Sequence, residues 1–499
     1  MTSYEGSETE NESLFEEYIF SGKMLNDRYI LISQIGEGTF ARVWSCFDIR
    51  SKNFNAIKIQ HIEEHECALD ELQYYNTINK SGNVNNSHKY ISTMIDYFTM
   101  EGNEGLHDCF VFNLAACSTY DIIRYIKYNK EDKPSPLSLK SIKQIIYQIL
   151  LAIKSINENY NLLHTDIRAE NILIMGTNKK MELFKQLFDY NHIEKSVTSR
   201  RKKMFKKFKK KKIPQDVETK MYEEVCTQYF QKILSDEKFD KFNEKFDKFN
   251  EEFNGSHTRS NISSDSTNYS ECDEHECSDN HKKKKYDEYD SFSDLDDFIN
   301  DEKSEEEIFD KNVANLLIDL KYLNNICIKL TDFGSACFED KKYSTIQARH
   351  YRAPEVIIGH DFNTSCDIWS VGCLLFELLT GEVLFRPNKT PFTSRNKYHL
   401  YKMYKLLGPI PNHMINRSKH HKLFFNRDGT LKINKKIKFK CIKEEIIDEI
   451  KLHRVKLEIN DDELNEVADF LRYTFEYDPE KRPNATILIN HKWFSNIDK

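Results

Sequence analysis

Long uncharged hydrophobic runs are absent from this sequence of 499 residues, because no stretch of about 18 apolar residues is present that could cross a membrane. The acidic start, MTSYEGSETENESLFEEY, is also unlike a secretory signal. A large net charge is missing too, since the chain carries −7 at pH 7 with 31% charged residues, which excludes a uniformly basic nucleic-acid-binding protein. We therefore expect an intracellular protein of the nucleus or cytoplasm, without membrane contact.

A disulfide framework is not expected either. The 12 cysteines are scattered through a large chain, which suits reduced thiols. The nearest approach to a metal motif is CDEHEC, where Cys272 and Cys277 flank His275. This motif lies in an acidic polar tract with no second ligand pair nearby, so we expect no metal there.

The composition changes along the chain at four places. Short β-branched and aromatic runs between glycines and charged turns predict a strand-rich segment, whereas the apolar spacing in LKSIKQIIYQILLAIKSINENYNLL predicts a buried helix. Basic, repetitive and acidic tracts then predict an insertion of roughly 150 residues, longer than an ordinary loop. The expected pieces are an acidic tail (1–27), a strand-rich lobe (28–115), a helical part (116–175), a low-complexity insertion (176–325) and a second helical part (326–499).

The first candidate site lies in IGEGTFARVW. Gly36 and Gly38 would let the backbone turn tightly and approach phosphates, and Val43 would pack on an adenine. A third glycine is replaced by Ala41, and two glycines alone are more typical of a plain β-turn than of a phosphate-binding loop.

Order along the chain strengthens the phosphate-binding interpretation. Ala56 and Lys58 lie in AIK on a presumed strand, where an isolated lysine is usually exposed to solvent. Glu71, in the helical stretch ECALDELQYY, is placed to form an ion pair that orients the lysine toward phosphates. Glu66 is the alternative partner.

Two acidic motifs follow. HTDIRAENILI places Asp166 and Asn171 five residues apart, and LTDFGSACF contains Asp332. A further element, RHYRAPE, ends at Glu355. Each motif alone occurs by chance in many chains, but their order indicates one catalytic unit.

Together these motifs resemble the eukaryotic protein kinases over residues 28–175 and 326–499. The HTD loop is similar to that shared by the SR-protein kinases and the LAMMER (Cdc2-like) kinases of the CMGC group. STYD, RHYRAPE and HLYKMYKLLGPIPNHMI resemble the LAMMER branch, whereas ALDEL, KLFFNRDGTLKINKKIKFK and the insertion resemble the SR-protein kinase branch. The resemblance implies an α+β fold with two lobes, rich in strands in the N-lobe and in helices in the C-lobe, interrupted by a long, largely disordered insertion.

The resemblance also implies ATP and Mg²⁺ as cofactors and a protein serine or threonine as the acceptor. Asp166 would accept or orient the hydroxyl proton, and Arg168 would contact the transferring phosphate. Asn171 and Asp332 would hold the magnesium ion. The remaining ATP contacts would come from Gly36, Gly38, Val43, Ala56, Lys58, Glu71 and the hinge residues Phe112, Asn113 and Ala115.

Thr165 stands where most kinases have an arginine that reads a phosphate on the activation loop. A threonine cannot make that contact, so we expect activity without activation-loop phosphorylation. His164 is expected to pack as a structural residue. The resemblance further implies a buried pair between Glu355 and Arg482 and an anchoring role for Asp367.

The substrate class stays open. The resemblance implies Arg/Ser-rich splicing factors and a monomer that binds no nucleic acid directly, yet the segment 395–456 is markedly basic. Acidic or already phosphorylated substrates, or dual specificity, are therefore alternatives. A pseudokinase scaffold that acts through its insertion is a further alternative, although it predicts a lost catalytic carboxylate and none is lost.

The insertion carries its own patterns. Phenylalanines at 239, 242, 246, 249 and 253 have the spacing of one helical stripe, which two heptads would form only transiently. The basic run 200–212 is typical either of a nuclear-localisation or phosphate-binding patch or of compositional drift. Ser291 and Ser293 precede acidic residues, as sites of an acid-directed kinase do.

Overall fold

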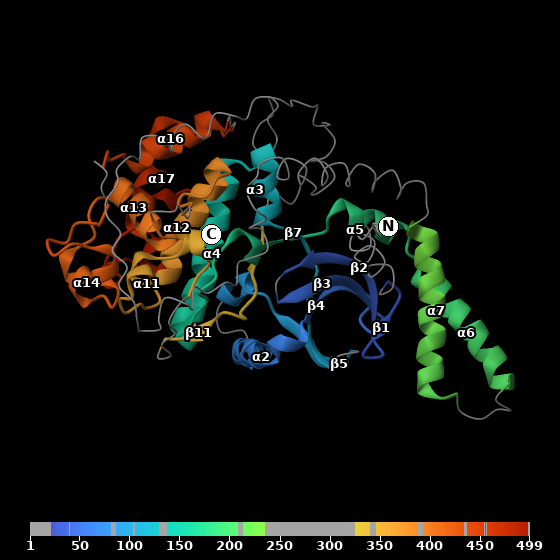
Figure 1. Ribbon diagram of the computed structural model, residues 1–499. Coiled ribbons are helices and arrows are strands. Elements are labelled where there is room, and N and C mark those ends of the chain that lie inside the picture. Colours follow the sequence, from blue (N-terminus) through green and yellow to red (C-terminus); the bar gives the residue numbers. More distant parts are fainter. Residues whose placement is uncertain are drawn as a thin grey trace, which may run out of the picture.

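The computed structural model places two lobes side by side, with a helical addition at the far end of the first lobe (Figure 1). No described helix is long and apolar enough to cross a membrane. The structure describes residues 21–38, 40–80, 86–102, 105–128, 137–207, 213–234, 325–339, 346–387, 393–433, 437–453, 455 and 457–497.

The first lobe is built on a six-stranded antiparallel sheet in the order β1-β2-β3-β4-β6-β5. The helix α2 (His65–Lys80) packs beside it, after a short turn of 3-10 helix, η1 (Ile62–Glu64). The strands are β1 (Met24–Leu25), β2 (Tyr29–Glu37), β3 (Ala41–Asp48), β4 (Asn53–Gln60), β5 (Met94–Glu101) and β6 (Leu106–Asn113).

The register of this sheet aligns candidate residues from separate motifs. Gly36 pairs with Val43, and Val43 pairs with Lys58, so they occupy one row across three strands. Ala56 lies two residues before Lys58 and therefore on the same face. The sheet thus collects the glycine motif and the lysine at one place.

The second lobe is mainly helical, and α12 lies at its centre. All residues of α12 are buried, as expected for a helix that is apolar all round. The helix α4 begins at its N-cap Ser138 and ends at Asn161, whose backbone is left-handed. The helices are α3 (Thr119–Tyr128), α4 (Leu139–Tyr160), α11 (Pro354–Ile358), α12 (Cys366–Thr380), α13 (Arg395–Leu407), α14 (Asn412–Arg417), α15 (His421–Phe424), α16 (Ile442–Leu452), α17 (Asp461–Thr474) and α18 (Ala485–Leu488). Short 3-10 helices add η2 (Asn86–Tyr90), η3 (Ala169–Asn171), η6 (Arg349–Tyr351) and η7 (Lys492–Phe494).

Two small antiparallel sheets lie between the lobes and bring two loops together. β8 pairs with β11, and β9 pairs with β10 and β7. One loop joins β8 to β9 and the other joins β10 to β11, so each loop is held at both ends by the other. These strands are β7 (Ala115–Ser118), β8 (Leu162–Leu163), β9 (Ile172–Met175), β10 (Ile328–Leu330) and β11 (Cys337–Phe338).

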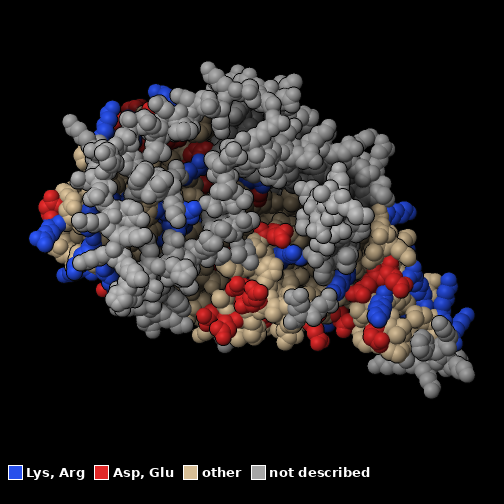
Figure 2. Space-filling model, viewed as in Figure 1, with Lys and Arg blue, Asp and Glu red and all other residues tan. Residues whose placement is uncertain are grey.

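The fold-class prediction of two lobes is confirmed, but the start of the expected insertion is helical. α5 (Lys179–Leu187), α6 (Tyr190–Lys207) and α7 (Gln215–Leu234) lie in it, and α6 and α7 run side by side (Figure 1). Their apolar residues form a second core with strands of the first lobe. Lys and Arg side chains gather on this end of the molecule, with acidic ones among them (Figure 2).

This second core explains why composition misled the prediction. The apolar residues that α5 to α7 bury are widely spaced between lysines and arginines. The sequence of this segment therefore resembles a low-complexity tract, although one face of the helices is apolar. The same core includes Met24 of β1, whose N–H donates to Glu223 of α7 at 3.1 Å. The expected tail 1–27 therefore includes a strand. The phenylalanine stripe, the Cys272 motif and the serines at 291 and 293 lie outside the described residues.

Candidate active site

Lys58 is the centre of the site. Its Nζ lies 3.0 and 2.9 Å from the two carboxylate oxygens of Glu71 and 2.7 Å from Oδ1 of Asp332. Burial would lower the pKa of Lys58, but the two carboxylates outweigh it and raise the pKa above its ordinary value. The alternative partner, Glu66, is exposed in the first turn of α2, and Lys58 pairs with Glu71 instead.

Two residues that the sequence analysis missed support this ion pair. Gln60, two positions after Lys58 on β4, donates its amide to Glu71 at 2.7 Å. Tyr75, one turn after Glu71 on α2, accepts the backbone N–H of Asp332 at 3.3 Å through its hydroxyl. Their spacing along β4 and α2 is the signal that could have found them.

The loop between β8 and β9 carries Asp166 and Asn171. The Nδ2 of Asn171 donates to the backbone oxygen of Asp166 at 2.9 Å and to its Oδ2 at 2.8 Å. Burial raises the pKa of Asp166 to about 6, against the opposing charge of Arg168. Both of these hydrogen bonds use the amide nitrogen of Asn171, so its amide oxygen would be the atom available to a cation.

Asp332 reaches the same place from the other loop. Thr331 donates its N–H to the backbone oxygen of Asn171 at 3.0 Å, and His164 contacts the oxygen of Thr331 at 3.0 Å through Nε2. Burial lowers the pKa of His164 to about 4, so its ring is neutral at pH 7, packed edge-on against Phe333. This geometry agrees with a structural role for His164.

Asp367 anchors the backbone of this loop. Its carboxylate accepts the N–H of His164 at 2.8 Å and the N–H of Thr165 at 2.9 Å. Thr165 needs this support because its φ is 62°, a left-handed conformation that β-branched residues rarely adopt. The predicted anchoring role of Asp367 is confirmed by these two contacts.

Thr165 also links the two loops through its side chain. Its hydroxyl donates to the backbone oxygen of Ser335 at 2.5 Å, three residues beyond Asp332. A residue in the place of an arginine thus makes a direct contact with the start of the activation segment. The sequence analysis missed this contact.

Arg168 forms a bidentate pair with Glu170. Its Nε lies 2.9 Å from Oε2 and its terminal nitrogen lies 2.8 Å from Oε1. One edge of the guanidinium is thus occupied by the Glu170 carboxylate. The positive charge of Arg168 still acts on Asp166.

The nucleotide-side candidates lie where the sheet meets the second lobe. Gly38 donates its N–H to the oxygen of Ala41 at 2.9 Å, closing the glycine turn. Phe112 is buried opposite Ala56, and Asn113 ends β6 with an exposed side chain. Ala115 opens β7, so the hinge connects the two lobes.

The end of the activation segment is held by side chains that the motifs did not indicate. Gln347, with φ 68°, donates to the oxygen of Cys366 and to the hydroxyl of Ser370, and accepts the N–H of Ala353. Arg352 donates to the backbone oxygen of Gln347 at 2.9 Å. Residues 340–345 lie outside the described chain.

A buried carboxyl lies below this segment. The Tyr351 hydroxyl donates to Glu377 of α12. Burial raises the pKa of Glu377 to about 7, because the carboxylate is held away from water.

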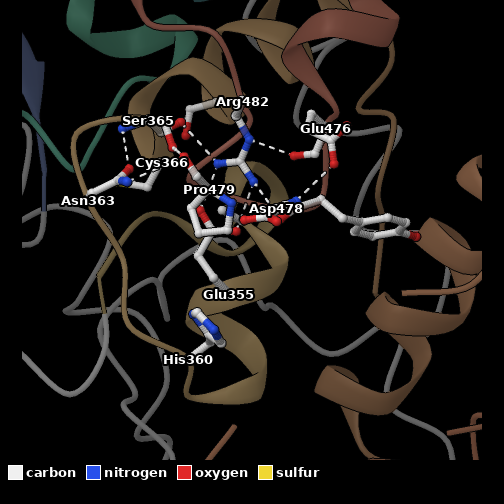
Figure 3. A network of polar contacts seen from close by, with 12 residues as sticks. Glu355, His360, Asn363, Ser365, Cys366, Glu476, Asp478, Pro479 and Arg482 are labelled. Atoms are coloured by element: carbon white, nitrogen blue, oxygen red, sulfur yellow. Dashed lines mark hydrogen bonds and ion pairs between the residues drawn. The ribbon is translucent and has the colours of Figure 1, made fainter. Parts of the chain in front are cut away.

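Glu355 and Arg482 form the predicted buried pair. Both side chains are fully buried, with nitrogen–oxygen distances of 2.7 and 2.9 Å. Figure 3 shows the Arg482 guanidinium with the chain around Ser365 on one side, Glu476 on the other and Glu355 below it. This prediction is confirmed.

The donor chemistry fits a nucleoside triphosphate and a divalent cation. Asp332 and Asn171 would supply two oxygen ligands to such a cation, which completes its shell with phosphate oxygens and water. Lys58 supplies a fixed positive charge beside them. Among the described residues, no cluster of three His, Cys, Asp or Glu side chains forms a self-sufficient metal site.

Comparison with known proteins supports the same assignment. A model of the protein kinase domain matches residues 29–209 and 310–494. The chain is 29% identical over 520 residues to L205 of Acanthamoeba polyphaga mimivirus, which is named as a serine/threonine-protein kinase; the match covers 99% of this chain and 93% of the relative. It is 27% identical to protein kinase dsk1 of Schizosaccharomyces pombe (94% and 81% covered) and 27% identical to SRSF protein kinase 3 of Mus musculus (95% and 87% covered).

Proposed function

Because the chain belongs to the protein kinase family, we propose that it transfers the γ-phosphoryl group of ATP to serine or threonine side chains of proteins, with Mg²⁺ as the metal. The observation that carries this proposal is the continuous set of contacts from Glu71 through Lys58 to Asp332, beside the Asp166–Asn171 pair. A scaffold without activity would have no need to keep all of these groups charged and aligned.

Each residue has one task in this proposal. When bound, the metal neutralises phosphate charge, and Asp332 and Asn171 would hold it. Lys58, fixed by Glu71, would bind the α- and β-phosphates. Asp166 would accept or orient the proton of the substrate hydroxyl, and Arg168 would neutralise charge beside it.

The test is transfer of labelled phosphate from MgATP to a serine peptide by the wild type and by Asp166→Asn. We expect kcat to fall by about 10²–10³ in the variant, with ATP binding retained. Asp361→Asn, at an exposed surface position, is the matched control. Equal transfer by Asp166→Asn and wild type would refute the role of Asp166.

We propose Arg/Ser-rich splicing factors as substrates, which would place the enzyme in the nucleus or cytoplasm. The support is the name of one relative, SRSF protein kinase 3, over 95% of this chain. An Arg/Ser peptide should therefore be phosphorylated faster than a serine peptide that lacks arginine. A poly-Glu/Tyr polymer tests dual specificity, and equal rates on it would contradict the proposal.

We also propose that activity does not require a phosphate on the activation segment. Thr165 and Gln347 support this proposal, because they hold the two ends of that segment through neutral hydrogen bonds. Phosphatase treatment of the purified enzyme should leave its rate unchanged. A rate that falls after the treatment would refute this part of the proposal.

A further inference from the structure

The face of the second lobe around α14 and α15 carries exposed cations. Figure 2 shows Lys and Arg side chains at the end of the molecule where Figure 1 places α14. We call this face the basic strip, and its members are Lys397, Arg417, Lys419, Lys422, Arg427 and Lys432. All except Lys397 have exposed side chains, and the apolar side chain of Leu423 is 59% exposed among them.

Local structure holds the strip together. After α15, Lys432 donates its N–H to the oxygen of Phe424, and its Nζ donates to the oxygen of Lys422 at 2.5 Å. Burial lowers the pKa of Lys397, and the charge of Lys432 lowers it further. Lysines from α13 and from the turn after α15 therefore lie close together.

The cations of the strip lack countercharges in the described structure. Its nearest acidic residue in sequence is Asp428, whose Oδ1 already accepts from the N–H and hydroxyl of Thr430. No ion pair to a carboxylate is present for any strip member within the described ranges. By contrast, Lys440 pairs with Glu445 and Asp448 at 2.7 Å just beyond the strip.

One end of the basic strip lies beside the end of the activation segment. Arg349, at the end of the activation segment, donates to Asn396 of α13 at 3.1 Å. On the other side, Lys419 donates its N–H to the oxygen of Gly359, directly after α11. A substrate chain that leaves the catalytic loop along α13 would therefore meet the strip.

We propose that the basic strip docks an Asp/Glu-rich segment of the protein substrate, at a distance from the serine or threonine that is phosphorylated. Charge complementarity selects this occupant, because an Arg-rich segment would meet unpaired cations of its own sign. Single-stranded nucleic acid is less suited to this surface, since the six strip members carry no aromatic ring, and the exposed Phe439 just beyond the strip already stacks on Tyr404. The role in substrate docking rests on the proposed kinase activity, whereas binding of the segment does not.

The first test is binding without ATP. A fluorescein-labelled Asp/Glu-rich peptide is titrated with the full chain and with Arg417→Glu/Lys422→Glu, and anisotropy is measured at low and high salt. We expect the variant to bind at least about tenfold more weakly, and wild-type binding to weaken with salt. Lys451→Glu/Arg472→Glu, an equal charge change at exposed positions on α16 and α17, should bind like the wild type.

The second test separates docking from catalysis. Transfer is measured to an acceptor peptide alone and to the same peptide joined by a flexible linker to the acidic segment. The acidic segment should raise kcat/KM, and Arg417→Glu/Lys422→Glu should abolish this gain while the acceptor alone reports on the catalytic residues.

Three outcomes would overturn the docking proposal: equal binding of the acidic peptide by the strip variant and the wild type, tighter binding of an Arg/Ser peptide to the strip, or displacement of the acidic peptide by a lower concentration of single-stranded RNA. Absence of transfer to every peptide, with acidic-peptide binding lost in the variant, would refute the kinase proposal and keep the binding site.

Discussion

At the scale of single residues, Thr165 joins three parts of the site. Its N–H is held by Asp367, its hydroxyl by Ser335, and its backbone is left-handed. The motif HTD led to the prediction that a phosphate-reading arginine is absent, but not to what replaces it. That replacement depends on the position of a backbone oxygen in another loop, which no spacing within the motif encodes.

The first prediction concerns this hydroxyl. Thr165→Val should lower the free energy of unfolding by about 1 kcal/mol, because the half-buried hydrogen bond to the backbone oxygen of Ser335 is lost. It should also slow phosphoryl transfer, since Asp332 lies in the same loop as Ser335, three residues before it. Urea unfolding and steady-state kinetics check both effects.

Thr165→Ser keeps the hydroxyl and is the control, so its stability and rate should stay near those of the wild type. A Val variant as active and stable as the Ser variant would show that the Ser335 contact does not hold the loops together.

The second prediction concerns Glu377. Its pKa of about 7 lies above the ordinary value of 4.5, so the folded state holds the proton more tightly than the unfolded state. Its contribution to stability is therefore largest below pH 4.5 and decreases as the pH rises to about 7. Glu377→Gln keeps an acceptor for Tyr351 without a charge, and should be more stable than the wild type at pH 8 by about 2 kcal/mol.

Urea unfolding of both proteins at pH 5 and pH 8 measures this difference. The advantage of the Gln variant should shrink at pH 5. A difference between the two proteins that does not change with pH would contradict the raised pKa.

At the scale of elements, the helices α5 to α7 extend the core of the first lobe. Phe184 and Phe230 pack on each other, and Phe184 also meets Phe54 of β4 edge-on. Leu114 of the hinge is partly buried against the same cluster. The helices therefore stabilise both the sheet and the connection between the lobes.

Strands and the long helices could be predicted because their apolar periods are dense, as in α4. The helices of the insertion could not be predicted in this way, because few apolar residues form their buried face. The basic run that begins at Arg200 also interrupts the apolar pattern. Pairs such as Arg200 with Glu224 of α7 satisfy these cations only once the helices meet.

The third prediction tests this core. Phe230 is 1% exposed, so Phe230→Ala should lower the free energy of unfolding by about 3–5 kcal/mol through lost burial and a cavity. Phe205→Ala, at a side chain on α6 that is 44% exposed, should change stability by less than about 0.5 kcal/mol. Similar small losses for both variants would mean that α7 contributes little to the lobe.

At the scale of the whole molecule, two lobes and a common site for Lys58, Glu71, Asp166 and Asp332 were implied by the kinase resemblance that the ordered motifs carry. The sequence shows the basic strip only as part of a basic segment, because whether a lysine finds a carboxylate depends on how the neighbouring helix is placed. Lys440 finds acidic partners on α16, whereas the basic strip finds none among the described residues.

The fourth prediction concerns a contact that spans the second lobe. Glu355→Gln leaves the Arg482 guanidinium buried without its countercharge, so stability should fall by about 3–5 kcal/mol. Thermal unfolding checks this loss. Glu480→Gln, at an exposed neighbour of the same network, should unfold close to the wild type. An equal effect of the two substitutions would show that burial of the pair is unimportant.

The long segment between β9 and β10 starts and ends at neighbouring strands of one small sheet. Met175 donates its N–H to the oxygen of Cys327, and Gln148 of α4 binds the returning strand through the oxygen of Ile326 and the N–H of Ile328. Two separately expressed fragments, cut after α7, would thus carry complementary strands, β9 and β10, that can pair when the fragments reassemble. The enzyme offers a natural place for a split reporter or for new chain ends in a circular permutant.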